Sequence, residues 1–487
     1  MKLRDVLRGI TVTELHADPD MELTGVCYDS RAAAPGVLFT AIRGFERDGH
    51  EYIGAAAANG AVCVLCEEPP ETVLPYVLTE NARAGLADAS ANWFANPAAR
   101  LKIIGVTGTN GKTTVTSLLK EIIERTTKRP VGLIGTNRNM IGRTEFPAER
   151  TTPESYEIQK LFARMADAGC EYAVMEVSSH ALALDRVHGV TFDVGVFMNL
   201  TPEHLDFHGT MEEYGAAKAS LSAQSRAMAV NLDDAYAETF LRDAKCPVYT
   251  FSAENDAADL VAKRIRLSPS KVRFCALMTG KLQRVELNIP GTFSVYNALA
   301  AIGAAHLIGI GAEDASEALA VSGGVKGRAE VVPTGGDYTV IIDYAHTPDA
   351  LSKIIAAVRE GTRGRVMTLF GCGGDRDKSK RRAMGEIAAR LSDFVVVTSD
   401  NPRTEAPEEI IGDILSGMRD TRTPYIVIEN RREAIRWALL NALPEDTVLL
   451  AGKGHETYQI FGKEKRHFDE REAVREILAE EMKLQAQ

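Results

Sequence analysis

The sequence has no long apolar run and no excess of positive charge. No segment approaches the roughly 20 consecutive apolar residues of a membrane-spanning helix, and the N-terminal MKLRDVLRGITVTEL lacks the apolar core of a signal peptide. A formal net charge of −11 over 487 residues argues against a nucleic-acid backbone as the main partner. We therefore expect a cytoplasmic protein that neither inserts into a membrane nor binds nucleic acid.

The cysteines are few and do not form a framework. There are seven, an odd number, scattered along the chain. Cys63 and Cys66 have the spacing of a zinc-binding pair, but no second Cys/His pair lies nearby. They also lie in GAVCVLCEE, which alternates as a buried strand does, and this favours structural cysteines over a metal site.

Length and patterning predict three domains. Single hydrophobic cores rarely exceed roughly 250 residues, and no short-period repeat or low-complexity segment is present. Residues 1–98 show short strand-like runs and one helical stretch at 82–94, which Asn96-Pro97 ends. We predict a small N-terminal α/β domain over 1–98, a central P-loop-type parallel-sheet ATPase domain over 99–332, and a C-terminal Rossmann-like domain over 333–487.

The two larger domains are predicted from alternating strand and helix patterns. From Leu101 apolar strands alternate with helices such as 112–126, which is typical of a parallel sheet covered on both faces. Residues 261–290 resemble a β-meander instead. After residue 337 the alternation begins again with TVIID, RVMTLFG, DFVVVTSD, YIVIEN and DTVLLAG, each of which precedes a helical pattern.

A glycine-rich loop between a strand and a helix predicts a phosphate site. In IIGVTGTNGKTTVTSLL, residues 103–119, backbone N–H groups and the helix N-terminus can surround an anion. Lys112 can reach the outer phosphates, and the Thr113 hydroxyl can bind Mg²⁺. The spacing is imperfect, since Val106 stands where the first glycine is usual, and an ordinary tight turn is the alternative.

Two later strands of this domain end in polar groups. Glu176 ends the strand EYAVMEV, and His204 follows the strand FDVGVFMNL. Alone, each can be an ordinary solvated or paired side chain. The carboxyl ends of parallel strands share one edge of a sheet, so we predict that both side chains lie in the crevice of the phosphate loop.

Several motifs together resemble the Mur ligases of peptidoglycan synthesis. They are GTNGKTT, EVSSHAL, NLTPEHLDFHG, YNALAA, KGRAE, DYAHTPDAL and DNPR, and they run over nearly the whole chain. The resemblance implies an amide ligase with ATP and Mg²⁺. It also implies a UDP-muramoyl-dipeptide as acceptor, an amino acid as second substrate, and a monomer.

The resemblance also implies roles for particular residues. The implied ATP-binding residues are Gly108, Thr109, Asn110, Gly111, Lys112, Thr113, Thr114, Asn297, Arg328 and Asp343. Those implied for the UDP-muramoyl-peptide are Ser30, Thr151, Thr152, Ser178 and Arg186. Considered one by one, Ser30 and the threonines can be turn residues, Asn297 can bond within its helix, and Arg328 can be an interface ion pair.

Lys218 shows what the resemblance adds. From composition it is a helical lysine among small residues, which usually lies in solvent. The resemblance implies a lysine N-carboxylated by CO₂, a carbamate that helps to hold Mg²⁺. The implied metal ligands are Thr113, Glu176, His204 and carboxylated Lys218, and the implied catalytic residues are Lys112, Lys218 and His204.

The segment VVVTSDNPRTEAPEEI, residues 395–410, places a stiff polar corner at the end of a strand. Arg403 carries a planar fork suited to a carboxylate, Arg376 follows another strand, and Glu456 can accept from an ammonium. A helix-entry turn is the alternative. In the resembled family an arginine here goes with meso-diaminopimelate rather than L-lysine. The predicted amino-acid-binding residues are Arg376, Asp400, Asn401, Pro402, Arg403, Gly452 and Glu456.

Three alternatives stay open. A P-loop kinase or ATPase would use the same loop without forming an amide. Folylpolyglutamate synthase is a sister ligase, and a catalytically silent binder of muramoyl-peptides is a third. The missing first glycine and the second α/β domain count against a kinase, and the presence of all five polar residues Lys112, Thr113, Glu176, His204 and Lys218 counts against a silent binder.

Overall fold

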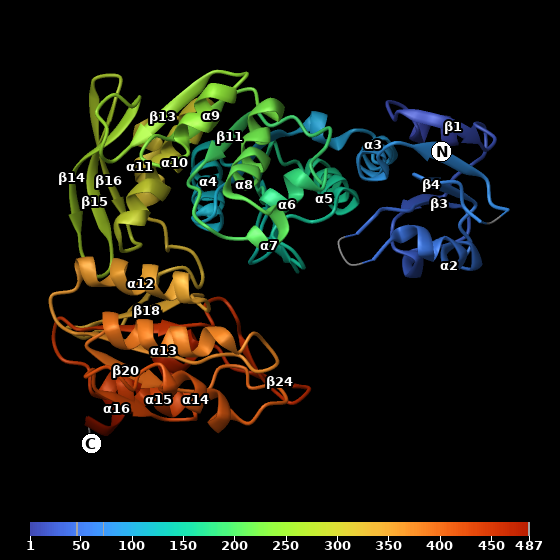
Figure 1. Cartoon of the computed structure of the whole chain (residues 1–487). Coiled ribbons are helices and arrows are strands. Elements are labelled where there is room, and N and C mark those ends of the chain that lie inside the picture. The colour runs from blue at the N-terminus through green and yellow to red at the C-terminus, as the bar shows by residue number, and fades with distance from the viewer. Residues whose placement is uncertain (45–46, 72, 486–487) are drawn as a thin grey trace. The chain divides into compact units, whose positions relative to one another are not determined.

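The computed structural model describes residues 1–44, 47–71 and 73–485 (Figure 1). The chain forms two compact units. One comprises residues 1–260 with 300–315, and the other comprises 261–299 with 316–487. In the described residues no helix is both long and apolar enough to cross a membrane.

The N-terminal part of the first unit is a five-stranded sheet in the order β1-β5-β4-β3-β2, with β1 antiparallel to β5 and the other pairs parallel. Its elements are α1 (Leu3–Val6), β1 (Val12–His16), β2 (Gly25–Cys27), β3 (Val37–Thr40), α2 (Ile53–Ala58), β4 (Cys63–Cys66), β5 (Tyr76–Thr79) and α3 (Ala82–Trp93). The prediction of one helix here was wrong, because the four-residue α1 and the six-residue, alanine-rich α2 accompany α3 and are too short to show apolar periodicity. Cys63 and Cys66 are free, buried thiols within β4, as predicted.

The rest of the first unit is mainly parallel sheet. Its order is β13-β12-β11-β6-β10-β7-β8-β9, where β7 to β9 form an antiparallel extension. The strands are β6 (Lys102–Thr107), β7 (Val131–Ile134), β8 (Asn139–Ile141), β9 (Thr144–Phe146), β10 (Tyr172–Glu176), β11 (Val194–Phe197), β12 (Met228–Asn231) and β13 (Val248–Ser252). The helices are α4 (Lys112–Thr127), α5 (Ser155–Asp167), α6 (Ser179–Ala183), α7 (Leu205–His208), α8 (Met211–Ala219) and α9 (Ala237–Asp243).

The central strands are buried on both faces, as the continuous apolar runs predict. No residue of β6 except Lys102 is exposed, and β10 is buried throughout. Ile103, Ala173 and Met175 share one core with Phe162 and Met165 of α5. Since these strands are parallel and in register, the polar residues after them emerge at one edge of the sheet.

The predicted meander lies in the second unit except for its first residue, Leu260. It consists of β14 (Leu260–Leu267), β15 (Val272–Met278) and β16 (Lys281–Leu287), with β15 and β16 paired antiparallel. The chain continues through α10 (Thr292–Leu307) and α11 (Ala312–Ala320), which begin or end in the other unit. A six-stranded sheet of order β17-β18-β22-β19-β20-β21 follows, parallel except for β17.

The strands of this sheet are β17 (Glu330–Val332), β18 (Thr339–Asp343), β19 (Val366–Phe370), β20 (Phe394–Val397), β21 (Tyr425–Val427) and β22 (Thr447–Ala451). The helices are α12 (Pro348–Gly361), α13 (Ser379–Leu391), α14 (Pro407–Ser416), α15 (Arg431–Leu440) and α16 (Glu470–Gln485). Helices α12, α13 and α14 pack in succession, and α15 packs on α16 (Figure 1). A hairpin of β23 (Tyr458–Phe461) and β24 (Glu464–His467), which was not predicted, lies between β22 and the helix that follows it, α16.

The fold class is the predicted one: mixed α/β, with a small N-terminal sheet, a central parallel sheet carrying a glycine-rich loop, and a C-terminal Rossmann-like sheet. The predicted boundaries after residues 98 and 332 stay predictions.

Candidate active site

The glycine-rich loop joins β6 to α4 as predicted, and two lysine amines meet on it. Gly111 has a φ of 89°, a conformation that favours glycine, directly before the first helical residue, Lys112. Lys112 Nζ donates to the carbonyl oxygens of Gly108, at 2.8 Å, and Thr109, at 3.0 Å. Lys218 Nζ donates to the Gly108 oxygen as well, at 3.1 Å. The loop thus gathers two amines from helices that are distant in sequence.

Lys218 is buried, contrary to the solvated lysine that composition alone suggests. It is 1% exposed, and its amine lies 4.7 Å from the centre of the Tyr214 ring. Burial is the main cause of a strongly lowered pKa, and the nearby charge of Lys112 lowers it further. A lowered pKa favours the neutral form of the amine, which is the form that reacts with CO₂.

Glu176 is a buried carboxylate held by neutral donors beside the loop. It is 1% exposed. It accepts from Thr113 Oγ1 at 3.1 Å, from the Thr136 backbone N–H at 2.8 Å and from Thr136 Oγ1 at 3.0 Å. Thr113 and Glu176 therefore come together as predicted. A carboxylate beside a hydroxyl at a phosphate loop is a donor set that suits Mg²⁺.

His204 takes part in an aromatic cluster with one link to the loop. Its ring meets the His180 ring edge-on, with 4.8 Å between centroids. It also lies edge-on to Tyr214, with 6.3 Å between centroids. Tyr214 in turn shares a hydrogen bond of 3.1 Å with Thr109 Oγ1 of the loop. The structure thus places His204 near the loop through Tyr214, and its role as a metal ligand stays a prediction. In the residues that the structure describes, no group of three or more His, Cys, Asp or Glu side chains is arranged to hold a metal.

The residues predicted for the muramoyl-peptide gather at the end of β10. Thr152 Oγ1 donates to the Glu176 carbonyl oxygen at 2.8 Å and accepts from the Ser178 N–H at 3.0 Å. Arg186 Nη1 donates to the Thr152 carbonyl oxygen at 3.2 Å. Thr151 Oγ1 lies 3.0 Å from Thr136 Oγ1 and donates to it, because the single hydroxyl proton of Thr136 goes to Glu176. Four predicted residues thus form one cluster that adjoins the phosphate loop.

Sequence reasoning missed a pocket beside this cluster. It has a volume of about 320 Å³, and its lining includes Tyr28, Arg150, Glu154 and Glu157. Tyr28 OH donates to Glu157 Oε2 at 2.9 Å, and burial raises the pKa of both groups. Tyr28 stands two residues before Ser30, whose carbonyl oxygen accepts from Asn59 Nδ2 at 2.8 Å. The position of Tyr28 next to the predicted uridine residue was the only signal available.

In the second unit, Arg328 and Asp343, both predicted to contact ATP, lie close to each other. The Arg328 guanidinium lies 5.4 Å from the centre of the Tyr344 ring. The Asp343 carboxylate accepts from the backbone N–H groups of Ala329, at 2.7 Å, and Ala345, at 2.8 Å. Burial raises the pKa of Asp343, and the charge of Arg328 opposes that shift. Asn297 is buried within α10.

The residues predicted for the amino acid converge on one pocket in the second unit. Its volume is about 380 Å³, and it is lined by Tyr344, His346, Gly371, Cys372, Gly373, Arg376, Lys380, Asp400, Asn401, Arg403, Gly452, Glu456 and Tyr458. The pocket is at the carboxyl ends of β18, β19, β20 and β22, where open α/β sheets bind ligands. Of the predicted set only Pro402 is not part of the lining.

Arg403 is held in an unusual backbone conformation by the hairpin. Its φ is 52°. Its N–H donates to the Ile460 carbonyl oxygen at 3.0 Å, and its own carbonyl oxygen accepts from the Gly462 N–H at 2.7 Å. Its Nη1 donates to the Gly374 carbonyl oxygen at 2.8 Å. The backbone of this corner is therefore hydrogen-bonded to the hairpin, and its guanidinium is fixed by Gly374. A simple helix-entry turn would need neither contact.

Gly452 has to be a glycine because the Asp400 carboxylate lies close to its Cα. A Cβ there would lie 2.9 Å from Asp400 Oδ2, and φ is +111°. Any side chain would strain the backbone and crowd the Asp400 carboxylate, which lines the pocket.

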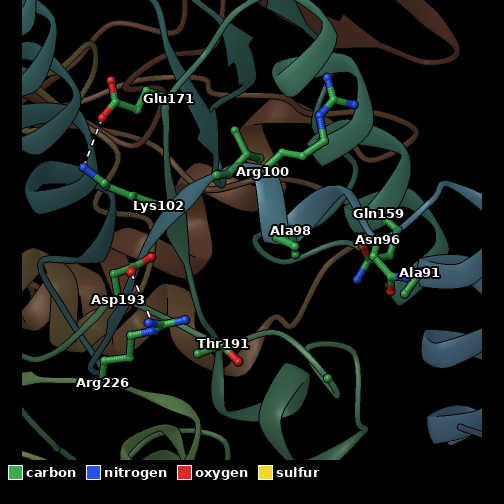
Figure 2. A pocket seen from close by; sticks show the side chains of 13 residues that line it. Ala91, Asn96, Ala98, Arg100, Lys102, Gln159, Glu171, Thr191, Asp193 and Arg226 are labelled. Atoms are coloured by element: carbon green, nitrogen blue, oxygen red, sulfur yellow. Dashed lines mark hydrogen bonds and ion pairs between the residues drawn. The ribbon is translucent and has the colours of Figure 1, made fainter.

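A larger cavity, of about 490 Å³, lies at the opposite edge of the first unit's sheet (Figure 2). It surrounds the amino ends of β6, β10 and β11. Four of its charged residues are paired with each other, Lys102 with Glu171 at 3.0 Å and Arg226 with Asp193 at 3.7 Å (Figure 2). The fifth, Arg100, is paired with Asp167, outside the lining, at 2.9 Å. These ion pairs leave little uncompensated charge for an anion, which favours the predicted phosphate site at the other edge, beside Lys112.

Comparisons with known proteins agree with this arrangement. Three family descriptions match: "Mur ligase family, catalytic domain" over residues 22–93, "Mur ligase middle domain" over 106–305 and "Mur ligase, glutamate ligase domain" over 327–454. A UDP-N-acetylmuramoyl-L-alanyl-D-glutamate–2,6-diaminopimelate ligase of Caldanaerobacter subterraneus subsp. tengcongensis is 50% identical over 99% of this chain and 100% of its own. The ligase 1 of that name from Clostridium acetobutylicum is 44% identical, with the same coverage. A solved structure of a ligase with this name has a TM-score of 0.76 at 30% identity, covering 99% of each chain.

Proposed function

Because the chain belongs to the Mur ligase family, we propose that it is an ATP-dependent ligase that adds meso-2,6-diaminopimelate to UDP-N-acetylmuramoyl-L-alanyl-D-glutamate. The product is a precursor of peptidoglycan. ATP and a UDP-linked acceptor as substrates favour the cytoplasm as the place of reaction.

The first step activates the acceptor. An amine attacks a free carboxylate poorly, so the carboxylate must first be activated. The carboxylate of the muramoyl-dipeptide attacks the γ-phosphorus of ATP, an acyl-phosphate forms and ADP leaves. Lys112 would neutralise charge on the transferring phosphoryl group, since its amine already lies on the loop carbonyls of Gly108 and Thr109. The remaining loop residues would bind phosphate oxygens through their N–H groups.

The site suits Mg²⁺ and a lysine carbamate. Thr113 and Glu176 would hold Mg²⁺, which screens the phosphate charges when it is bound. Lys218 is buried and has a lowered pKa, which favours its neutral amine. That amine can add CO₂ and release a proton, which leaves a carbamate anion. We propose His204 as a further ligand. These assignments rest on the donor types around the loop.

The cluster at the end of β10 would hold the acceptor. Thr151, Thr152, Ser178 and Arg186 lie beside Glu176, so a carboxylate bound by Arg186 would lie near the phosphate loop. We propose Ser30 for the uridine end. Asn297, Arg328 and Asp343 complete the proposed ATP contacts.

The second step forms the amide. An unprotonated amine of diaminopimelate attacks the acyl-phosphate, and phosphate leaves from the tetrahedral intermediate. Arg403 and Arg376 would pair with carboxylates of the amino acid, and Glu456 with an ammonium. These three line one pocket of about 380 Å³. This convergence of two arginines and a carboxylate is the observation that carries the proposal, because it matches a zwitterion with more than one carboxylate.

The test measures phosphate release and amide product with each candidate acceptor and amino acid. The proposal expects release to require the UDP-muramoyl-dipeptide and meso-diaminopimelate together. Phosphate release without an amino acid would indicate an ATPase or kinase, and release with a folate acceptor and glutamate would indicate a folylpolyglutamate synthase. Binding without turnover would indicate a silent binder.

A further inference from the structure

Lys453 is a fully buried lysine that does not line the amino-acid pocket. It follows β22 directly after Gly452, and its side chain is 0% exposed. Removing a lysine charge from water is costly unless partners compensate for it. Lys453 donates to two residues that do line the pocket, Asn401 and Glu456, and its amine lies 5.7 Å from the ring centre of a third, Tyr458.

Three polar groups form a closed triangle. Lys453 Nζ donates to Glu456 Oε2 at 3.1 Å and to Asn401 Oδ1 at 3.3 Å. Asn401 Nδ2 donates to the same Glu456 Oε2 at 3.0 Å. The backbone N–H of Ile460 also donates to Asn401 Oδ1, at 3.0 Å. Each group therefore has a partner of the right polarity.

This triangle determines how two side chains can meet a ligand. Asn401 Oδ1 already accepts from two donors, so the amide nitrogen is its remaining functional group. Glu456 Oε2 already accepts from two donors, so Oε1 is the oxygen left for a further donor. Asn401 thus offers an N–H donor and Glu456 offers an acceptor, a pairing that matches the carboxylate and the ammonium of one amino-acid centre.

We propose that Lys453 is a positioning residue for amino-acid specificity. It holds the amide of Asn401 and the carboxylate of Glu456 in one orientation towards the pocket, without touching the substrate. The inference rests on the proposed function, in which Glu456 binds an ammonium of diaminopimelate.

The experiment is a double-mutant cycle on the full-length enzyme, with KM for meso-diaminopimelate, KM for ATP and kcat as readouts. The variants are Lys453→Met, Glu456→Gln and the double variant. If Lys453 acts through Glu456, each single change raises the KM for diaminopimelate at least about tenfold, and the double variant resembles Glu456→Gln alone. The KM for ATP should change less than about twofold in all three.

A matched control separates positioning from stability. Lys120 lies in the first unit, away from the amino-acid pocket. It is a buried lysine of α4, paired at 2.7 Å with Glu124 of the same helix. Lys120→Met should lower the melting temperature and leave the KM for diaminopimelate unchanged. If Lys453→Met fails to fold, the comparison of the double variant with Glu456→Gln tests the proposal instead. The double variant removes both the lysine and the carboxylate, so it leaves neither charge buried without its partner.

The outcomes distinguish the two proposals. If the double variant has a KM at least about tenfold above that of Glu456→Gln, the two residues act independently, and the positioning role is wrong. If Glu456→Gln raises KM and Lys453→Met matches the wild type, the positioning role is likewise wrong, but the proposed function stands. If Glu456→Gln leaves KM unaltered, the ammonium assignment and this inference are both wrong.

Discussion

The amines of Lys112 and Lys218 both donate to the carbonyl oxygen of Gly108, at 2.8 and 3.1 Å. Two side chains that share one acceptor cannot both be ordinary protonated lysines without mutual repulsion. The lowered pKa of Lys218 reduces that repulsion, because burial and the charge of Lys112 both favour its neutral form.

Lys112→Ala should reduce ligation by at least about 10³-fold, because the loop loses the cation that stabilises the transferring phosphoryl group. Binding of the UDP-muramoyl-dipeptide should change little. The measurements are amide formation and calorimetric titration of the acceptor. Lys102→Ala, at the opposite edge of the same sheet, is the control and should keep wild-type turnover. If Lys112→Ala kept the turnover of the wild type, the glycine-rich loop would have no part in phosphoryl transfer.

Lys218 should carry a carboxyl group in the active enzyme. Carbon-13 bicarbonate should give a carbamate signal in the NMR spectrum of the wild type, and this signal should be missing in Lys218→Met. The same substitution should abolish ligation. A high-resolution crystal structure grown under CO₂ that shows a plain amine, together with an active Lys218→Met enzyme, would contradict the assignment.

Arg403→Ala should weaken the use of meso-diaminopimelate sharply and leave ATP and acceptor affinity nearly unchanged. Lysine lacks the remote carboxylate, so binding it leaves a guanidinium without an anion, at a cost of about 2–5 kcal/mol. The wild type should therefore prefer diaminopimelate over lysine by roughly 10⁴-fold in kcat/KM. The assay compares both amino acids in both enzymes. Equal use by the wild type would mean that the corner is only a turn.

Gly373→Ala should impair amino-acid use while the fold persists. The added Cβ would lie 2.9 Å from Arg403 Nη1, the far end of a flexible side chain, so the guanidinium moves and the backbone does not. We expect the KM for diaminopimelate to rise by about tenfold. Gly412→Ala is the matched control: it lies within α14 with nothing near the added Cβ, and should stabilise slightly. An unchanged KM in Gly373→Ala would mean that the guanidinium position does not matter.

Glu405 should make the second unit sensitive to acid. Hydrogen bonds from Arg381, then Lys378, lower its pKa from 4.5 to about 2. A carboxyl with a lowered folded-state pKa stabilises the fold above its unfolded pKa, and that stability is lost as pH falls through about 2. Urea unfolding between pH 7 and pH 2 should show Glu405→Gln less stable than the wild type at pH 7, with the difference shrinking towards pH 2. A difference independent of pH would contradict this.

Local patterns predicted the parts of the site that local geometry builds. The phosphate loop and the Asp400–Arg403 corner each follow one strand, and parallel strands bring such corners to one edge. The sequence could not predict pairs that depend on tertiary packing, such as Tyr28 with Glu157 or Lys453 with Asn401. Nor could it predict the β8–β9 extension, because strands of three residues are too short to show a period.

Any redesign of the amino-acid preference has to treat Arg403 and the β23–β24 hairpin as one module. The backbone of Arg403 is bonded to Ile460 and Gly462, and its left-handed conformation depends on those bonds. Grafting the four-residue corner of a related protein into this chain would therefore place the new side chain on a backbone that is still held by this chain's own hairpin. A successful transplant should carry the hairpin with it, and chimaeras exchanged at both segments should outperform those exchanged at one.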